Sequence, residues 1–407
     1  MALEFSSRKE TFPNYRVWET TLAGRPFVVE TGKMCGLSNG SCLVRYGETV
    51  VLCNVTMSEK PREGIDFFPL SVEFEEKLYA VGRIPGSFMR REGRPGEKAI
   101  LTSRVVDRPI RPLFPKEMRN DVCVTMTVMS VDQDCSPEIA GMIGTSIALS
   151  ISEIPWKGPI GGVFMGLVDG QLVVNPTLEQ RQNSDLQLTV AATMNKIVMI
   201  EAGANEVDEA TMLEAIKMAH GEIKKIIAFI NGIVAEIGKP KIDFVSMDLD
   251  YDLFTKIRAE YLDDFKAAMD TDDKNVRDAR LLPIQDKLEA EYPDLDDATV
   301  GLIMYKMQKY VVRRWLLDDG KRVDGRGINE IRPLAAEVGL LPRVHGSGMF
   351  TRGQTQVLTT CTLGNTKDSQ LMDDLGTEPY KRYIHHYNYP PYSVGEARAP
   401  RSPGRRE

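Results

Sequence analysis

Hydrophobic residues from Arg25 to Val128 recur in short alternating runs rich in β-branched side chains, and turn-forming residues separate these runs. Such a pattern predicts β-strands that bury one face. Asn39-Gly40 and Tyr46-Gly47-Glu48 lie in the gaps and predict the turns of antiparallel hairpins. The runs that we interpret as strands are residues 27–30, 41–45, 49–55 and 123–128.

Helical periodicity follows the predicted strands. It appears over Ile139–Ile151 and again from about Asp208 to Ile237, where Asp208 is a suitable N-cap. The second helix carries one apolar stripe, formed by Met212, Ile216, Ala219, Ile223, Ile227 and Ile230. Strands and helices in one segment predict that residues 1–237 form an α/β or α+β domain.

An acidic, helix-forming segment comes next. Gly238-Lys239-Pro240 interrupts the periodicity, after which Leu253, Ile257, Tyr261 and Phe265 recur at helical spacing. Residues 248–319 hold 18 acids and 11 bases, a difference of −7 that equals the net charge of the whole chain, so the remaining residues balance at 40 of each sign. The acids lack the spacing of a calcium-binding loop. We therefore expect an all-helical linker domain, residues 238–320, with solvated acidic faces.

Two parts of the chain repeat each other. The segment 39–52, Asn-Gly-Ser-Cys-Leu-Val-Arg-Tyr-Gly-Glu-Thr-Val-Val-Leu, recurs 306 residues later at 345–358 as His-Gly-Ser-Gly-Met-Phe-Thr-Arg-Gly-Gln-Thr-Gln-Val-Leu. Further along, Val394-Gly395 matches Val81-Gly82. We infer a duplicated domain whose second copy begins near residue 321. Residues 321–407 are shorter than the first copy, so we expect the natural chain to continue past residue 407.

Cysteines, histidines and apolar runs exclude several classes of protein. The six cysteines form no Cys-x-x-Cys pair, and the adjacent His385 and His386 lack a second ligand at metal spacing, which argues against a zinc site. No apolar run approaches the roughly 18 residues of a membrane span. Arg8, Lys9 and Glu10 interrupt the N-terminus before a signal-peptide core. We expect a cytoplasmic protein with reduced thiols and no membrane association.

A basic stretch stands out within the neutral part of the chain. Residues 83–119 contain ten bases and four acids, a local charge of +6. Such a stretch is typical of a surface that binds a polyanion. The alternative is a solvated loop whose charges face water.

Four motifs identify a family. They are Gly86-Ser87-Phe88-Met89-Arg90-Arg91-Glu92-Gly93-Arg94-Pro95, then Asp107-Arg108-Pro109-Ile110-Arg111-Pro112-Leu113-Phe114-Pro115, then Asp324-Gly325-Arg326, and finally His386-Tyr387-Asn388-Tyr389-Pro390-Pro391-Tyr392 followed by Gly404-Arg405-Arg406-Glu407. Together they resemble the bacterial polynucleotide phosphorylase family. Met89 departs from the family pattern, because many members carry a second phenylalanine there.

The resemblance implies a fold and an activity. The fold is a duplicated ribonuclease PH-like core (ribosomal protein S5 domain 2-like), here joined by the helical linker, in a ring-shaped homotrimer with an RNA channel. The activity is 3′-to-5′ phosphorolysis of RNA in mRNA degradation, which releases nucleoside diphosphates, with inorganic phosphate as co-substrate and Mg²⁺ or Mn²⁺ as cofactor. Single-stranded RNA is the expected partner, together with other proteins of RNA-degradation complexes. The KH and S1 modules of family members lie outside this sequence.

The resemblance also implies roles for particular residues. Arg405 and Arg406 match the paired arginines that bind the RNA 3′ end at the reaction centre, and the phosphate-binding serines and metal ligands are expected beyond residue 407. Guanidinium groups suit such work because they stay charged and bind phosphate oxygens in a bidentate fork.

The first copy is expected to be catalytically silent. Ser136-Pro137-Glu138 aligns with the phosphate-binding serines, and Arg181, Gln187 and Thr189 align with the two metal-binding aspartates and the lysine. Instead of catalysing, the first copy should guide RNA. The residues that we assign to RNA binding are Phe88, Arg90, Arg91, Arg94, Arg108 and Arg111. For Arg108 and Arg111 the alternative is a bracing role, in which arginines between prolines bind backbone carbonyls or carboxylates.

Two functions of different class compete. The first is the phosphorolytic enzyme, which also runs in reverse as a polymerase of nucleoside diphosphates. The second is a non-catalytic RNA-binding or assembly subunit of a ribonuclease PH-type ring. A hydrolytic exonuclease is less consistent with the sequence, because the acids lie on the linker helices.

Overall fold

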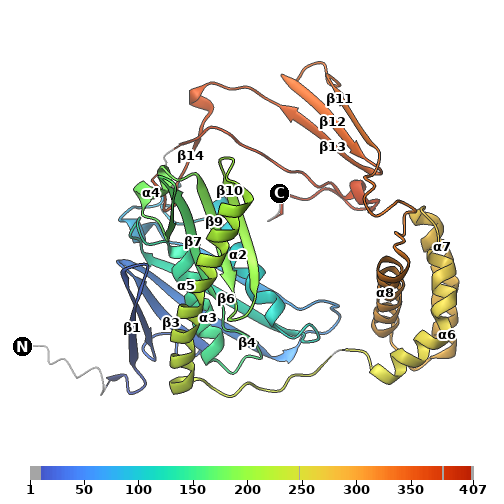
Figure 1. Ribbon diagram of the computed structural model, residues 1–407, viewed down its shortest axis with the longest axis horizontal. Coiled ribbons are helices and arrows are strands. Elements are labelled where there is room, and N and C mark those ends of the chain that lie inside the picture. The colour runs from blue at the N-terminus through green and yellow to red at the C-terminus, as the bar shows by residue number, and fades with distance from the viewer. Residues whose placement is uncertain (1–10, 247, 378–379, 405–407) are drawn as a thin grey trace, which may run out of the picture. The chain divides into compact units, whose positions relative to one another are not determined.

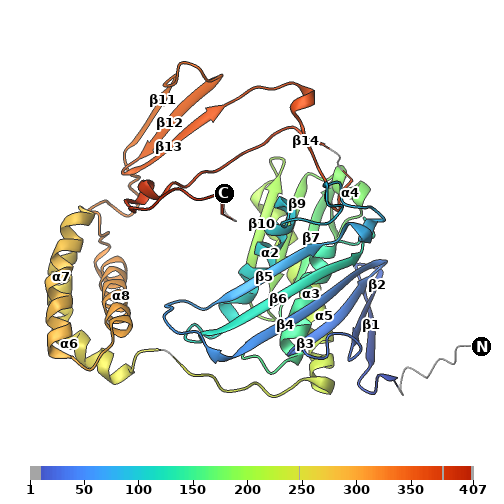
Figure 2. The same ribbon diagram turned by 180° about the vertical axis from the view of Figure 1, so that it is seen from behind.

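The computed structural model describes residues 11–246, 248–377 and 380–404 (Figures 1 and 2). The chain forms two compact units. One consists of residues 1–246 together with 370–407, and the other of residues 247–369.

The first unit contains a six-stranded sheet in the order β1-β2-β3-β4-β6-β5. All neighbours are antiparallel except β5 and β6, which run parallel. The strands alternate buried and exposed positions, and β6 does so over most of its length, as a sheet with one buried face requires. The strands are β1 (Arg16–Leu22), β2 (Arg25–Thr31), β3 (Gly40–Tyr46), β4 (Thr49–Pro61), β5 (Leu70–Glu76) and β6 (Asn120–Ser130).

A second, four-stranded sheet has the antiparallel order β10-β9-β7-β8. Its strands are β7 (Gly161–Val168), β8 (Gln171–Val174), β9 (Leu186–Ala192) and β10 (Ile197–Ala204). The helices of this unit are α2 (Glu97–Ile110), α3 (Pro137–Ile151), α4 (Leu178–Gln182) and α5 (Glu209–Ile237), and short 3₁₀ turns occur at Leu78–Val81, Arg111–Leu113 and Pro391–Val394.

Helix α3 forms the centre of the first unit. Every residue from Ile139 to Ile151 is buried, because α3 contacts β3 and β4 of one sheet, β7 of the other sheet, and helix α5 (Figures 1 and 2). A helix that is apolar on all sides is typical of such a central position. The N-terminus of α3 therefore lies in a fixed place relative to both sheets.

These elements confirm most of the sequence predictions for this unit. The predicted strands correspond to β2, β3, β4 and β6, and the predicted helices to α3 and α5. Asp208 is the N-cap of α5, where its carboxylate accepts hydrogen bonds from the backbone N–H groups of Ala210 and Thr211. In the apolar stripe, Ala219, Ile223, Ile227 and Ile230 are buried and Met212 and Ile216 partly buried.

The turn predicted at Asn39-Gly40 is wrong. Residues 32–39 connect β2 to β3, and Gly40 is the first residue of β3. Gly40 is needed for close packing instead, because a Cβ atom there would lie 2.2 Å from the backbone oxygen of Ala148 in α3. The turn at Gly47-Glu48 is confirmed, and Gly47 has a φ of 55°.

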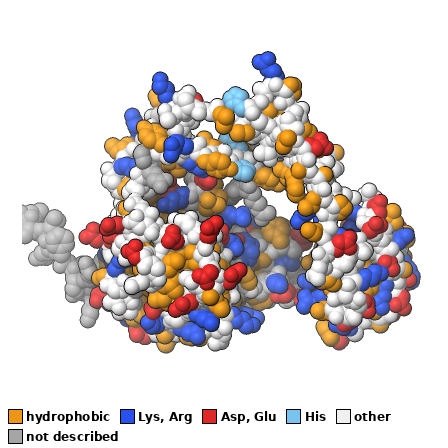
Figure 3. All heavy atoms as spheres, turned by 45° about the horizontal axis from the view of Figure 1, so that its top comes forward, with side chains coloured by type: hydrophobic (Ala, Val, Ile, Leu, Met, Phe, Trp, Pro, Cys, Tyr) orange, Lys and Arg blue, Asp and Glu red, His pale blue; other side chains and the backbone are white. Residues whose placement is uncertain are grey.

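The second unit contains three helices, α6 (Tyr251–Met269), α7 (Lys274–Glu291) and α8 (Asp297–Arg314), followed by a π-helical turn at Trp315–Asp319. Ile257, Tyr261 and Phe265 of the predicted periodic set are buried in the core of these helices. Acidic and basic side chains are interspersed on their surface (Figure 3). Among the described residues, no helix is long and apolar enough to cross a membrane.

A three-stranded antiparallel sheet completes the second unit, in the order β11 (Leu334–Val338), β12 (Gly346–Arg352) and β13 (Thr355–Cys361). Its register repeats that of the first copy. Tyr46 pairs with Thr49 in β3–β4, and Arg352 pairs with Thr355 in β12–β13, so each residue is shifted by the 306 positions found in the sequence. The remaining short elements are a 3₁₀ turn at Thr366–Asp368 and the two-residue strands β14 (Gln370–Leu371) and β15 (Tyr380–Lys381), which pair with each other.

The match between Val81-Gly82 and Val394-Gly395 is also structural. Each pair ends a 3₁₀ turn, and the two glycines adopt left-handed conformations, with φ of 69° at Gly82 and 77° at Gly395. The structure thus bears out the duplication at both places where it describes the two copies.

Candidate functional site

The segment Arg83–Arg94, which we call the basic loop, connects the 3₁₀ turn at Leu78–Val81 to α2. Phe88 is 99% exposed at its tip. Arg90, Arg91 and Arg94 are exposed as well, and within the described residues their guanidinium groups make no hydrogen bond or ion pair. An exposed aromatic ring beside uncompensated guanidinium groups is suited to stack on bases and bind phosphates of a single-stranded nucleic acid.

Other bases of the +6 stretch are engaged by the protein itself. Arg119 is buried and donates to the backbone oxygens of Ile65, Lys116, Met118 and Asp66. Arg111 donates to both carboxylate oxygens of Asp107 and to the backbone oxygens of Phe68 and Leu70.

Arg108, in the middle of the stretch, forms an ion pair with Glu201 of β10. Arg111 thus has the bracing role that was the alternative to RNA binding. Arg108 binds a carboxylate, where the RNA-binding hypothesis expected a phosphate. Arg90, Arg91 and Arg94 of the basic loop, by contrast, are exposed and have no ion pair among the described contacts.

A segment from the second copy of the repeat reaches the root of the basic loop. Asp373 accepts a hydrogen bond from the Gly86 N–H at 2.9 Å, and Arg83 donates to the backbone oxygen of Asp374. On the loop itself, the carboxylate of Glu92 accepts a hydrogen bond from the Leu78 N–H at 3.2 Å. The loop is thus held at its root while its tip stays exposed.

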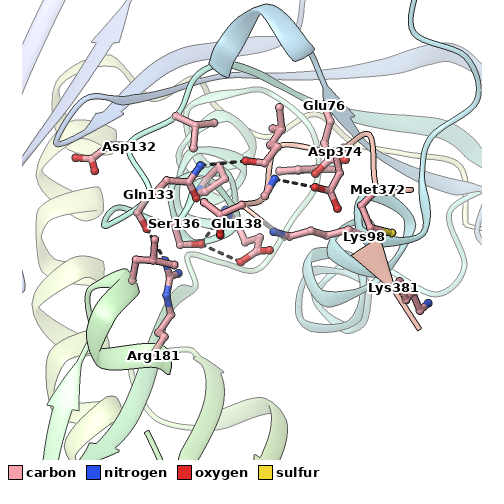
Figure 4. Close-up of a pocket in the computed structure, with 17 residues that line it drawn as sticks. Glu76, Lys98, Asp132, Gln133, Ser136, Glu138, Arg181, Met372, Asp374 and Lys381 are labelled. Atoms are coloured by element: carbon pink, nitrogen blue, oxygen red, sulfur yellow. Dashed lines mark hydrogen bonds between the residues drawn. The ribbon is translucent and has the colours of Figure 1, made fainter. Parts of the chain in front are cut away.

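A pocket of about 310 Å³ lies beside this contact, at the N-terminus of α3 (Figure 4). Ser136, the N-cap of α3, accepts hydrogen bonds from the backbone N–H groups of Glu138 and Ile139 and donates one to the Glu138 carboxylate at 2.9 Å. Pro137 has no N–H to offer. The helix end that normally favours an anion is therefore already occupied, and the carboxylate of Glu138 repels a second one.

Glu76 of β5 lines the same pocket. Its pKa is raised to about 7, mainly by burial. The nearby carboxylates of Asp374 and Glu138 contribute to this rise, whereas the Lys98 ammonium group opposes it. Figure 4 shows these four side chains converging on one side of the pocket from β5, α2, α3 and the segment after β14. Arg181 and Lys381 line the pocket as well, so it carries charges of both signs.

A neighbouring cavity of about 390 Å³ brings Arg181, Gln187 and Thr189 together with Glu138. These three residues are the ones that the sequence analysis aligned with metal ligands and a lysine, so the fold does bring the aligned positions into one place. Arg181 donates to the backbone oxygen of Gln133. A guanidinium, an amide and a hydroxyl do not fit a divalent cation. Across the described ranges, no group of three or more His, Cys, Asp or Glu side chains is arranged to hold a metal.

Two predicted site residues, Arg405 and Arg406, lie outside the described residues. Conversely, the sequence analysis missed Asp373, Asp374 and Glu76, since its motifs did not include them. The sequence did contain one signal for this contact. Asp373-Asp374 is an acidic pair, and the basic stretch elsewhere in the chain has the opposite charge.

Three family models match segments of the chain. Residues 23–155 and 330–407 match the model of the 3′ exoribonuclease family, domain 1, and residues 158–222 match domain 2 of that family. Residues 252–327 match the RNA binding domain of polyribonucleotide nucleotidyltransferase. The first model matches twice, at both copies of the repeat inferred from the sequence.

Curated relatives carry one name. A polyribonucleotide nucleotidyltransferase of Ruminiclostridium cellulolyticum is 56% identical over 397 residues, covering 97% of this chain and 56% of the relative. Proteins of the same name from Heliobacterium modesticaldum and Alkaliphilus oremlandii are each 53% identical, over 96% and 97% of this chain and 56% of each relative. The chain therefore spans about half the length of the curated relatives it matches.

Proposed function

Because the chain belongs to the 3′ exoribonuclease family, we propose that it acts in phosphate-dependent 3′-to-5′ degradation of RNA, a reaction that releases nucleoside diphosphates. The family match at both copies and the relatives named polyribonucleotide nucleotidyltransferase support this assignment. Within that activity, we assign the first copy to guiding RNA.

The observation that carries the guiding role is the basic loop. Phe88, Arg90, Arg91 and Arg94 are exposed side by side, and the three guanidinium groups are left without a partner in the described part of the chain. Phe88 is 99% exposed and the adjacent Met89 77% exposed, so the tip of the loop presents apolar surface beside the arginines. An RNA strand supplies both a base to stack on Phe88 and phosphates for the arginines. We leave Arg111 out of this surface, since Asp107 and two carbonyl oxygens already bind it.

The reaction centre belongs to the second copy in this proposal. Arg405 and Arg406 bind the 3′-terminal part of the RNA there, and inorganic phosphate is the co-substrate. Mg²⁺ or Mn²⁺ supplies charge neutralisation when bound. The residues of the first copy do not fit that metal, so no step is assigned to them.

Single-stranded RNA is the proposed partner, and a homotrimer within an RNA-degradation complex is the proposed assembly. The six cysteines are free, which supports a reducing, cytoplasmic location. The second candidate is a non-catalytic RNA-binding subunit of a ribonuclease PH-type ring. The helix terminus occupied by Ser136 and Glu138 supports this candidate, since it leaves little room for a phosphate in the first copy.

RNA binding measured as a function of salt tests the guiding role. If Arg90, Arg91 and Arg94 each contact one phosphate, replacing all three by Ala lowers the slope of log affinity against log salt by roughly 0.7 per contact, about 2 in total. Replacing Arg111 by Ala is the matched control and should leave the slope unchanged. A triple variant with the wild-type slope and an intact fold contradicts the proposal.

A further inference from the structure

We propose that residues 372–377, which we call the strap, position the basic loop for RNA, with Asp373 as the positioning residue. The strap belongs to the second copy of the repeat and the basic loop to the first. One copy of the duplicated domain thus sets the conformation of the RNA-binding loop of the other. This inference rests on the proposed role of the basic loop in guiding RNA.

The strap is attached to the first copy at three successive residues, Asp373, Asp374 and Leu375, and one further hydrogen bond lies within the strap. Asp373 accepts from Gly86, and the backbone oxygen of Asp374 accepts from Arg83. The Leu375 oxygen accepts from Gln133 Nε2 at 3.0 Å, and the Gly376 N–H donates to the Asp374 carboxylate at 2.8 Å (Figure 4). Consecutive contacts of this kind fix the path of the strap.

The side chain of Leu375 anchors the strap. It is 3% exposed and belongs to the same hydrophobic core as the two sheets of the first copy. Burying a leucine to this extent stabilises the contact between the strap and the first copy. Asp373, two residues before Leu375, is exposed, and its carboxylate accepts the hydrogen bond from Gly86 of the loop.

The contact at Gly86 acts at the place where the basic loop begins. A Cβ atom at Gly86 would lie only 3.1 Å from Asp373 Oδ2, so the two groups are closely opposed. Gly86 lies two residues before Phe88 and four before Arg90. Further along the loop, the described contacts are local, from the Arg90 N–H to the Ser87 oxygen and from Ser87 Oγ to the Arg91 oxygen. Those contacts shape the tip but do not fix its direction, whereas Asp373 and Asp374 fix the root.

The effect on RNA follows from the cost of ordering a loop. A loop already held at its root loses less conformational entropy when RNA binds, and so binds more tightly with the same contacts. Releasing the root therefore lowers affinity without removing any phosphate contact. The salt dependence, which reports the number of phosphate contacts, is then preserved.

Asp373→Ala and Asp373→Asn, made in the 407-residue chain, form a matched pair. Both remove one negative charge, but only asparagine keeps an oxygen that accepts the Gly86 N–H. Hydrogen exchange over residues 83–94 should be up to about tenfold faster in Asp373→Ala than in Asp373→Asn, the scale of one lost hydrogen bond between neutral groups. Affinity for an unstructured single-stranded RNA should be weaker by about the same factor, with equal salt slopes. As a control, Glu63→Ala removes an exposed carboxylate outside the basic loop and the strap. Its exchange rates and its RNA affinity should match those of the wild type.

Equal exchange rates and equal affinities in the two Asp373 variants overturn the inference. The proposed guiding role is then judged separately, by the salt slope of the triple arginine variant. Faster exchange in Asp373→Ala, with equal RNA affinities of the two variants, also overturns the inference. The strap would then order the loop without any consequence for RNA binding. If, in addition, the triple arginine variant keeps the wild-type salt dependence of RNA binding, the guiding role fails as well.

Discussion

At the scale of single residues, the structure separates arginines that the sequence presents as equals. Arg119 is buried among carbonyl oxygens and Arg111 is bound to Asp107, whereas Arg90 and Arg91 extend from an exposed loop. All belong to one stretch of local charge +6. A guanidinium that already donates its N–H groups to the protein has none left for a phosphate, so the local charge overstates the binding surface.

Arg405 and Arg406 are the residues for which kinetics gives the clearest result. In a protein that contains the complete second copy, replacing both by Ala should lower kcat at saturating RNA by at least about tenfold, with a smaller change in RNA affinity. Contacts made in the transition state affect kcat, whereas contacts made equally in the ground state affect binding. An unchanged kcat with weaker binding would reassign the pair to RNA guidance.

At the scale of elements, acidic groups of β5, α3 and the strap lie together beside a lysine of α2. Glu76 of β5 faces Lys98 of α2, Glu138 of α3 and Asp374 of the strap, and Asp132, Arg181 and Lys381 also line the pocket. Burial and the two neighbouring carboxylates raise the pKa of Glu76 to about 7. The protonated form is the one that this packing favours.

The stability of this arrangement should therefore depend on pH. Since the pKa of Glu76 is about 7 in the folded chain and 4.5 ordinarily, its contribution is complete below pH 4.5 and is lost as pH rises through 7. Glu76→Gln, which resembles the protonated form, should unfold like the wild type near pH 5 and be more stable above pH 7. We expect a difference of about 2 kcal/mol after solvent screening.

Chemical denaturation of both proteins from pH 5 to 8 measures this difference. Glu63→Gln, at an exposed position, controls for the loss of one negative charge. A difference between Glu76→Gln and the wild type that stays constant over this range would contradict a raised pKa at Glu76.

At the scale of the whole molecule, the two copies of the duplication share a fold. β3–β4 and β12–β13 keep the same register, and both copies match one family model. In the first copy, however, the N-terminus of α3 is capped by Ser136 and faced by Glu138. A shared fold therefore does not imply a shared site.

The 407-residue chain by itself should consequently release no nucleoside diphosphate. The first copy presents Glu138, Arg181 and Gln187 where phosphate and metal sites are expected, and these side chains suit neither. Incubation with 3′-hydroxyl RNA, phosphate and Mg²⁺, followed by separation of the nucleotides, measures the release. Sustained release that disappears on replacing Glu138 by Ala would show that the first copy is active.

The sequence by itself determined part of the elements, the duplication and the family. Strand alternation, the stripe of α5 and the repeat at 306 residues are local or periodic patterns, and they depend on backbone geometry that each segment carries in its own residues. The basic loop was likewise found from composition and motif. For these features, residue type and spacing are sufficient.

Only the tertiary structure decided which charges are free and which segments meet. Asp107 and Arg111 are four residues apart on one helical turn, but Gly86 and Asp373 are 287 residues apart, and Gln133 and Leu375 are 242 apart. No local pattern encodes such pairs, because they arise only when the strap packs on the first copy. The raised pKa of Glu76 has the same origin, since burial and a distant carboxylate act only after the strap has packed on the first core.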